Sequence, residues 1–238
     1  MDIVETEIII SDLEIVEDRI KKIERLAKIS KDKGETEMEL LLRVKRYLDT
    51  GRFVAMEDFD ETERHVVRGF DLIATKPLFY IANVDEDTLA DIPLPKIEDA
   101  AKQRNRQVVY ICGKLEQDLS VLPEEERSSY MELYGMKEFS IEKIIHVGYR
   151  ILDLITFYTV VGKVMRAWTI PRGTPCIKAA GKIHTDMEKG FIRAEVINID
   201  DFIACGSEHA ARERGLLRLE GKEYIVQDGD ILHIRFNV

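Results

Sequence analysis

Apolar side chains recur in alternating steps of four and three near the start of the chain, at Ile9, Leu13, Val16, Ile20, Ile23 and Ala27. This heptad seam predicts one long helix whose narrow apolar stripe needs a partner helix to cover it. A polar break containing Gly34 follows, and apolar residues return at Met38, Leu41, Val44 and Leu48. The two stretches therefore predict an antiparallel helical hairpin, a short coiled coil, which ends near residues 50–51 and carries no chemistry.

A different pattern begins near Lys76. Two short apolar runs, residues 77–82 and 108–112, flank a helical stretch at 96–106. Strand, helix and strand in this order indicate a βαβ unit of a parallel sheet, and a continuous apolar run is typical of a strand buried on both faces. Another amphipathic helix is predicted over 141–154. Because two parallel strands cannot form a closed layer alone, we expect one side of a larger sheet.

The last third of the chain predicts several short strands around one main helix. The expected strands are 164–170, 192–197, 216–219, 222–226 and 231–236, with a main helix at 179–189 and a short helix at 208–214. This pattern fits a small β-grasp domain. We therefore expect a multidomain chain of α/β and α+β class, with domains at 1–72, 73–153 and 154–238.

Composition excludes some classes of protein. The net charge is −10 and the pI is about 5.2, which rules out a uniformly basic nucleic-acid coat but not a local basic face. The three cysteines form no C-x-x-C pair, so we expect reduced thiols and no metal site. The sequence has no apolar run of ~20 residues and no cationic stretch at its start, so we expect a cytoplasmic, soluble chain.

Two polar loops follow the predicted strands of the βαβ unit. Residues 83–86, Asn-Val-Asp-Glu, come directly after the first strand, and residues 112–116, Cys-Gly-Lys-Leu-Glu, come after the second. Loops at the carboxyl ends of parallel strands face the ligand crevice. Each loop has a plain alternative, because a polar turn after a strand is common.

The longest resemblance lies in the C-terminal third of the chain. The motifs Arg-Ala-Trp-Thr-Ile at 166–170, Ala-Ala-Gly-Lys-Ile-His-Thr-Asp at 179–186, Gly-Phe-Ile-Arg-Ala-Glu-Val at 190–196 and Val-Gln-Asp-Gly-Asp at 226–230 occur in this order. They resemble the TGS domain of the Obg-like ATPase (YchF) family, which belongs to the P-loop GTPase superfamily. Glu7 with residues 11–14 is similar to the family's entry into its helical insertion.

The resemblance implies a G domain split by a helical hairpin and followed by a TGS β-grasp domain. Such proteins use ATP with Mg²⁺ in preference to GTP and associate with ribosomes, through the large subunit, the 70S particle or ribosomal RNA. By resemblance, Asn83 and Glu86 would face the adenine edge, and Val84 would pack on the base or donate its backbone N–H to it. Residues Cys112, Gly113 and Lys114 would close the base pocket, although Cys112 and Gly113 differ from the usual Ser-Ala.

The phosphate-binding motif G-x-x-x-x-G-K-[ST] does not occur in the sequence. Without it the chain has no nest of N–H groups for phosphates and no hydroxyl ligand for Mg²⁺. We expect a fragment without the P-loop part of the G domain, which binds adenine nucleotides weakly and does not hydrolyse ATP alone. Whether the chain is an enzyme stays open, because the alternative is a non-catalytic TGS-containing module that binds ribosomes or RNA.

Basic residues concentrate in one stretch of this acidic chain, at Lys163, Arg166, Arg172, Lys178, Lys182, Lys189 and Arg193. They predict a contact with ribosomal RNA, and the alternative is a solvated face without a partner. Trp168 or His184 could add a stacking surface, although a core role suits Trp168 better. We also expect a monomer, and we hypothesise that oxidation of Cys112 blocks nucleotide entry.

Overall fold

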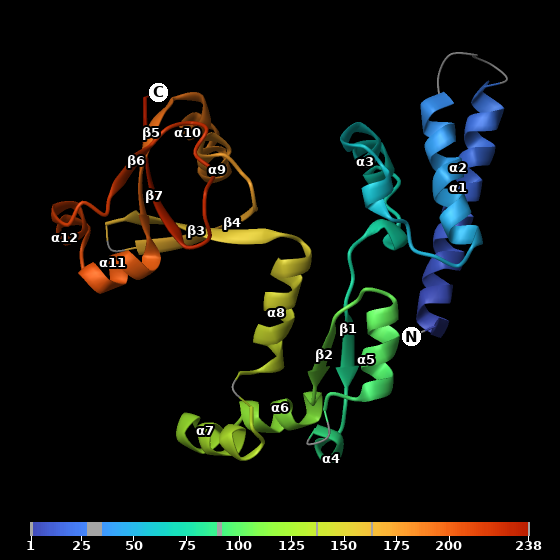
Figure 1. Cartoon of the computed structure of the whole chain (residues 1–238), viewed down its shortest axis with the longest axis horizontal. Coiled ribbons are helices and arrows are strands. Elements are labelled where there is room, and N and C mark those ends of the chain that lie inside the picture. The colour runs from blue at the N-terminus through green and yellow to red at the C-terminus, as the bar shows by residue number, and fades with distance from the viewer. Residues whose placement is uncertain (1, 28–34, 90–91, 137, 163, 238) are drawn as a thin grey trace. The chain divides into compact units, whose positions relative to one another are not determined.

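The computed structural model describes residues 2–27, 35–89, 92–136, 138–162 and 164–237, and Figure 1 shows its helices and strands. The chain forms two compact units, Met1–Pro77 and Leu78–Val238. Within the described residues, no helix has the length and apolar character needed to cross a bilayer.

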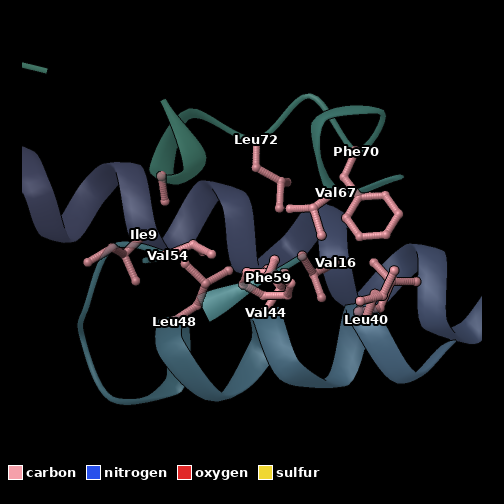
Figure 2. Close-up of a cluster of buried hydrophobic side chains, with 12 residues drawn as sticks. Ile9, Val16, Leu40, Val44, Leu48, Val54, Phe59, Val67, Phe70 and Leu72 are labelled. Atoms are coloured by element: carbon pink, nitrogen blue, oxygen red, sulfur yellow. The ribbon is translucent and has the colours of Figure 1, made fainter. Parts of the chain in front are cut away.

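The first unit is built on two helices, α1 (Asp2–Ala27) and α2 (Glu35–Asp49). Figure 2 shows that they run in opposite directions, with Ile9 of α1 beside Leu48 of α2. The expected seam is largely buried: Val16, Leu41 and Val44 are inaccessible to solvent. The predicted break around Gly34 lies outside the described residues.

Residues after α2 complete the core of this unit. The 3₁₀ helix η1 (Met56–Asp58), helix α3 (Glu61–Arg68) and the 3₁₀ helix η2 (Ile73–Thr75) follow α2. Val67 of α3, Ala74 of η2 and the connecting residues Phe59, Phe70 and Leu72 add buried side chains to the seam. Asp60 and Glu63 form a capping box at the start of α3. The helix pair is therefore covered by its own following segment, which the sequence analysis did not assign.

The second unit begins with a βαβ arrangement. Strands β1 (Tyr80–Asn83) and β2 (Val108–Ile111) are parallel, and α4 (Glu86–Leu89) and α5 (Pro95–Gln103) lie between them in the chain. The prediction of a first strand buried on both faces is wrong for these residues, because Ile81 is 48% exposed and Asn83 is also exposed. An apolar run indicates that a strand prefers burial, but the strand is buried only where other parts of the protein pack against it.

Three helices connect the βαβ arrangement to the second sheet. They are α6 (Gly113–Ser120), α7 (Glu124–Leu133) and α8 (Ser140–Ile151). Leu115 and Leu119 of α6 form a small core with partly buried residues of the following segments. Helix α8 lies close to the predicted range of 141–154, whereas α7 was not predicted.

The C-terminal sheet has five strands in the order β4-β3-β7-β5-β6. Their bounds are β3 Leu154–Val161, β4 Val164–Pro171, β5 Phe191–Asn198, β6 Arg218–Glu220 and β7 Asp230–Phe236. Strands β3 and β7 pair in parallel, and the other pairs are antiparallel. Strand β3 was not predicted. The predicted strand at 222–226 is wrong, since only an isolated bridge joins Ile225 to Pro175.

Helices pack on both faces of this sheet (Figure 1). Helices α9 (Cys176–Ile183) and α10 (Thr185–Lys189) cover the larger core on one face. The predicted single helix at 179–189 is wrong, because His184 leaves the helical conformation and its Nδ1 accepts the N–H of Asp186. Helices α11 (Ile199–Cys205) and α12 (Glu208–Glu213) pack on the other face.

Candidate functional site

The two polar loops predicted to read a base are neighbours in the structure. The N–H of Val84 donates to the carbonyl of Ile111 over 2.8 Å, which extends the pairing of β1 and β2 by one residue. Adjacent parallel strands deliver the following loops to the same edge of the sheet. Residues 83–86 and 112–114 therefore meet at the carboxyl ends of these strands.

A hydrogen bond between Asn83 and Gly113 fixes the two loops to each other. The N–H of Gly113 donates to Asn83 Oδ1 over 3.1 Å. Gly113 is the first residue of α6, and such an N–H has no partner within its own helix. Asn83 supplies the missing acceptor, so the start of α6 is held at the end of β1.

A second contact joins the same loops. Lys114 Nζ lies 3.5 Å from Glu86 Oε1, and the two side chains are 82% and 37% exposed. An exposed ion pair of this kind contributes about 0–1 kcal/mol. The pair stabilises the loops weakly, and its main consequence is that Glu86 has a cationic neighbour.

Asp85 serves the local turn. Its Oδ1 accepts the N–H of Thr88 over 2.8 Å at the start of the short helix α4. Hydrogen bonds from Thr88, through its side chain first and its backbone second, hold the pKa of Asp85 below the ordinary value. Asp85 is therefore ionised and structurally engaged, while Asn83 and Glu86 on either side face the other loop.

Glu116 is a residue of the second loop motif to which the sequence analysis assigned no role. Both of its carboxylate oxygens lie 3.1 Å from the N–H of Ser140, and the hydroxyl of Ser140 also donates to it. Ser140 is the first residue of α8, so Glu116 satisfies the start of that helix. The only signal for this role in the sequence was the presence of an acidic residue three positions after Gly113.

Cys112 lies beneath the base loops. Its side chain is 2% exposed and belongs to the small core with Leu115 and Leu119. Oxidation requires an accessible thiol with thiolate character. The hypothesis that Cys112 oxidation gates nucleotide entry is therefore disfavoured in this conformation.

The basic residues predicted for an RNA contact do not form one surface. Lys163 lies outside the described residues. Lys178 and Lys182 belong to α9 and Lys189 to α10, where Lys178 pairs with Glu188 over 2.7 Å. Arg172 pairs with Asp153 over 3.0 Å beyond the end of β4. Arg166 is exposed on β4 and Arg193 on β5.

Of the two candidate stacking residues, only one is on the surface. Trp168 stacks on Phe157 at a centroid distance of 6.4 Å, and its Nε1–H donates to Thr159 Oγ1 over 2.9 Å. Trp168 therefore belongs to the core, as its strand position indicated. His184 is exposed between α9 and α10.

A metal centre needs several ligating side chains in one place. Across the residues that the structure places, no group of three or more His, Cys, Asp or Glu side chains could hold a metal ion. The two loops thus present an amide, a carboxylate and a helix-start N–H at the ends of β1 and β2.

The chain resembles known proteins along nearly its whole length. A family model described as "YchF-GTPase_C: Protein of unknown function (DUF933)" matches residues 154–237. "Ribosome-binding ATPase YchF" of Haemophilus ducreyi is 39% identical over 99% of this chain and 65% of its own length. The protein of the same name from Bacillus subtilis is 39% identical over 98% of this chain and 64% of its own length.

Solved structures agree with these matches. The Schizosaccharomyces pombe YchF GTPase aligns with a TM-score of 0.84 and 28% identity, over 98% of this chain and 64% of that one. A GTP-binding protein from Pyrococcus horikoshii OT3 aligns with a TM-score of 0.62 at 20% identity, over 99% of this chain and 70% of that one, and supports the fold alone.

The chain has a mixed α/β fold in which a parallel strand pair ends in two polar loops. This is the fold of the class of GTP-binding proteins that includes the solved YchF GTPase. Within that class, the chain belongs to the YchF family. It spans about 65% of the length of the curated relatives it matches.

Proposed function

We propose that this chain is the base-reading and partner-binding part of a ribosome-associated ATPase of the YchF type. The observation that carries the proposal is the hydrogen bond from Gly113 N–H to Asn83 Oδ1, which assembles the two loops into one pocket edge. The relatives named ribosome-binding ATPases support the same assignment.

The pocket edge favours adenine over guanine. Guanine presents paired N1–H and N2–H donors, and a carboxylate that accepts both reads them best. The carboxylate at this position is Glu86, whose Oε1 lies 3.5 Å from Lys114 Nζ. Val84 lacks the longer polar side chain that would assist the recognition of guanine. Gly113 and Lys114 close the pocket from the second loop, and the buried Cys112 supports them from the core below. We therefore propose ATP as the preferred nucleotide and GTP as the weaker one.

We propose three domains: a helical, coiled-coil insertion at 1–72, part of a split G domain at 73–153 and a TGS β-grasp domain at 154–238. The packed α1–α2 pair supports the first, and the parallel β1–β2 pair supports the second. The five-stranded sheet with α9 across one face supports the third.

The residues present fit the base of a nucleotide and do not fit its phosphates. The two loops supply an amide, a carboxylate and a helix-start N–H. The sequence has no G-x-x-x-x-G-K-[ST] motif to hold phosphates and Mg²⁺. Phosphoryl transfer depends on positioning those charges, so the 238-residue chain alone would not hydrolyse ATP.

The partner in this proposal is the ribosome, contacted through ribosomal RNA by a monomeric cytoplasmic protein. Exposed cations on α9, α10, β4 and β5 support an electrostatic contact. Counterion release from RNA would supply much of the binding free energy. A non-catalytic TGS-containing module that docks on ribosomes is the second candidate, and the missing phosphate motif favours it.

Titration with nucleosides tests the pocket, because nucleosides carry the base without phosphates. We expect adenosine to shift the amide resonances of Val84 and Gly113 in ¹H–¹⁵N spectra. Asn83→Ala removes the acceptor of the Gly113 N–H, and we expect adenosine affinity to fall by a factor of about 3–10.

Gln103→Ala, at an exposed position of α5, is the matched control and should leave the titration unchanged. Equal adenosine affinity in the Asn83→Ala and wild-type chains would refute the assignment of the pocket. So would shifts confined to residues outside the two loops.

A further inference from the structure

Two arginines lie directly opposite each other on neighbouring strands of the C-terminal sheet. The register pairs Arg193 of β5 with Arg235 of β7, and Glu195 with His233. Directly opposed residues project from the same face of a sheet, and residues two apart on one strand share that face. Arg193, Glu195, His233 and Arg235 therefore share one face.

The position of Ile197 and Ile231 identifies that face. They are paired in the same register and pack with Ala211 of α12, so the face is the one that α11 and α12 partly cover. The opposite face carries Ala194 and Val196 in the core beneath α9. The arginine pair is thus on the side of the sheet away from the α9 lysines.

A third arginine reaches this face from α12. Glu195 Oε2 accepts from Arg212 Nη2 over 3.1 Å and from Arg235 Nη2 over 3.3 Å. The Glu195 side chain is 7% exposed, whereas those of Arg212 and Arg235 are 55% and 46% exposed. Both guanidiniums therefore bind one buried carboxylate, and both side chains remain about half exposed.

We name Arg193, Arg212 and Arg235 the arginine face. Arg212 and Arg235 bind Glu195, and Arg193 lies opposite Arg235 on the same face, in a chain whose net charge is −10. Like charges directly opposite each other destabilise a sheet. The Arg193–Arg235 pair therefore costs stability in the free protein, and an anionic partner would remove that cost.

We propose that the arginine face binds the phosphodiester backbone of RNA. Guanidinium groups bind phosphate through two parallel N–H bonds, and several guanidiniums on one face can meet successive phosphates. The proposal deepens the proposed association with ribosomes and rests on it. It moves the main RNA contact from the lysines of α9 and α10 to the opposite face of the sheet.

Fluorescence anisotropy with a labelled RNA duplex of about 16 base pairs tests the proposal at two salt concentrations. Arg193→Gln with Arg235→Gln should weaken binding at least fivefold and lower the salt slope by about 1–2. The matched control is Lys182→Gln with Lys189→Gln, which removes equal charge on the helical face and should weaken binding less than twofold.

Arg193→Gln alone is the second variant, because it leaves the hydrogen bonds from Arg212 and Arg235 to Glu195 in place. It should weaken RNA binding at least twofold without lowering the thermal midpoint. A full loss of binding confined to variants that unfold would overturn the proposal, as would equal weakening by the two double variants.

Two further outcomes separate this inference from the proposed function. If wild-type chain binds a polyglutamate peptide through these arginines and ignores the RNA, the partner is an acidic polypeptide and the inference fails. If it binds neither, the ribosome contact also fails, whereas adenosine titration of the base loops still reports on nucleotide binding.

Discussion

At the scale of single residues, a buried polar network holds the last strand and the turn before it. Asp230 is 1% exposed and accepts from Tyr224 Oη over 2.7 Å, from the N–H of Gln227 over 2.9 Å and from Arg218 Nη2 over 3.4 Å. The segment around Tyr224 has no strand pairing beyond the isolated bridge at Ile225. Side-chain hydrogen bonds to Asp230 therefore add to the few backbone hydrogen bonds that join this segment to residues 174–177.

Tyr224 makes this network sensitive to alkaline pH. Burial, followed by the hydrogen bond to Asp230, raises the pKa of Tyr224 from 10.0 to about 12. A raised pKa stabilises the folded chain fully below pH 10, and that contribution is lost as the pH rises towards 12. In Tyr224→Phe, the loss of unfolding free energy between pH 9 and 12 should be smaller by about 1 kcal/mol.

Urea unfolding at several pH values measures this difference. Tyr130→Phe, at an exposed position of α7, is the control and should follow the wild-type pH dependence. Identical alkaline losses in Tyr224→Phe and wild type would show that Tyr224 titrates normally.

At the scale of elements, a buried carboxylate joins two segments of the first unit. Asp12 of α1 is 1% exposed, and its Oδ2 accepts the N–H of Ala74 in η2 over 2.6 Å. Asp12 lies beside the seam residues Leu13 and Val16, and it belongs to the motif that resembles the family's helical insertion. The structure gives this motif a physical role, since it fastens η2 to the long helix.

Asp12→Ala should lower the free energy of unfolding of the first unit by about 1–3 kcal/mol, because it leaves the buried N–H of Ala74 without its acceptor. Asp12→Asn keeps an oxygen acceptor and should cost less. Urea denaturation followed by circular dichroism measures both, with the exposed Asp18→Ala as control. A loss in Asp12→Ala no larger than in Asp18→Ala would contradict this role.

Periodicity predicted the elements whose partners lie nearby in the sequence. The seam of α1 and the helix start of α8 could be predicted because local spacing determines them. The break at His184 could not, since a single side-chain cap to Asp186 divides two helices. Strand β3 was missed although its antiparallel partner β4 follows it directly in the chain, and its parallel contact with the distant β7 could not be predicted from local spacing. Arg212 and Arg235 meet at Glu195 only through the register of β5 with β7 and the packing of α12 on the sheet.

At the scale of the whole molecule, the chain carries two loops that we propose to read a base, and its sequence has no G-x-x-x-x-G-K-[ST] motif. The loops could be predicted from the sequence because motif and strand end coincide at Asn83 and Gly113. The hydrogen bond between Gly113 and Asn83 and the ion pair between Lys114 and Glu86 could be found only from the structure. We therefore propose that this chain recognises the base of a nucleotide and gains little binding affinity from its phosphates.

Comparing the affinities of adenosine and ATP, with and without Mg²⁺, tests that claim most directly. Titration calorimetry or amide shifts of Gly113 supply both dissociation constants. We expect the dissociation constants of adenosine and ATP to agree within about threefold and Mg²⁺ to change neither constant. We also expect no ATP hydrolysis, since no nest of N–H groups holds the phosphates. ATP binding more than about tenfold tighter than adenosine, or Mg²⁺-dependent turnover by the pure chain, would contradict it.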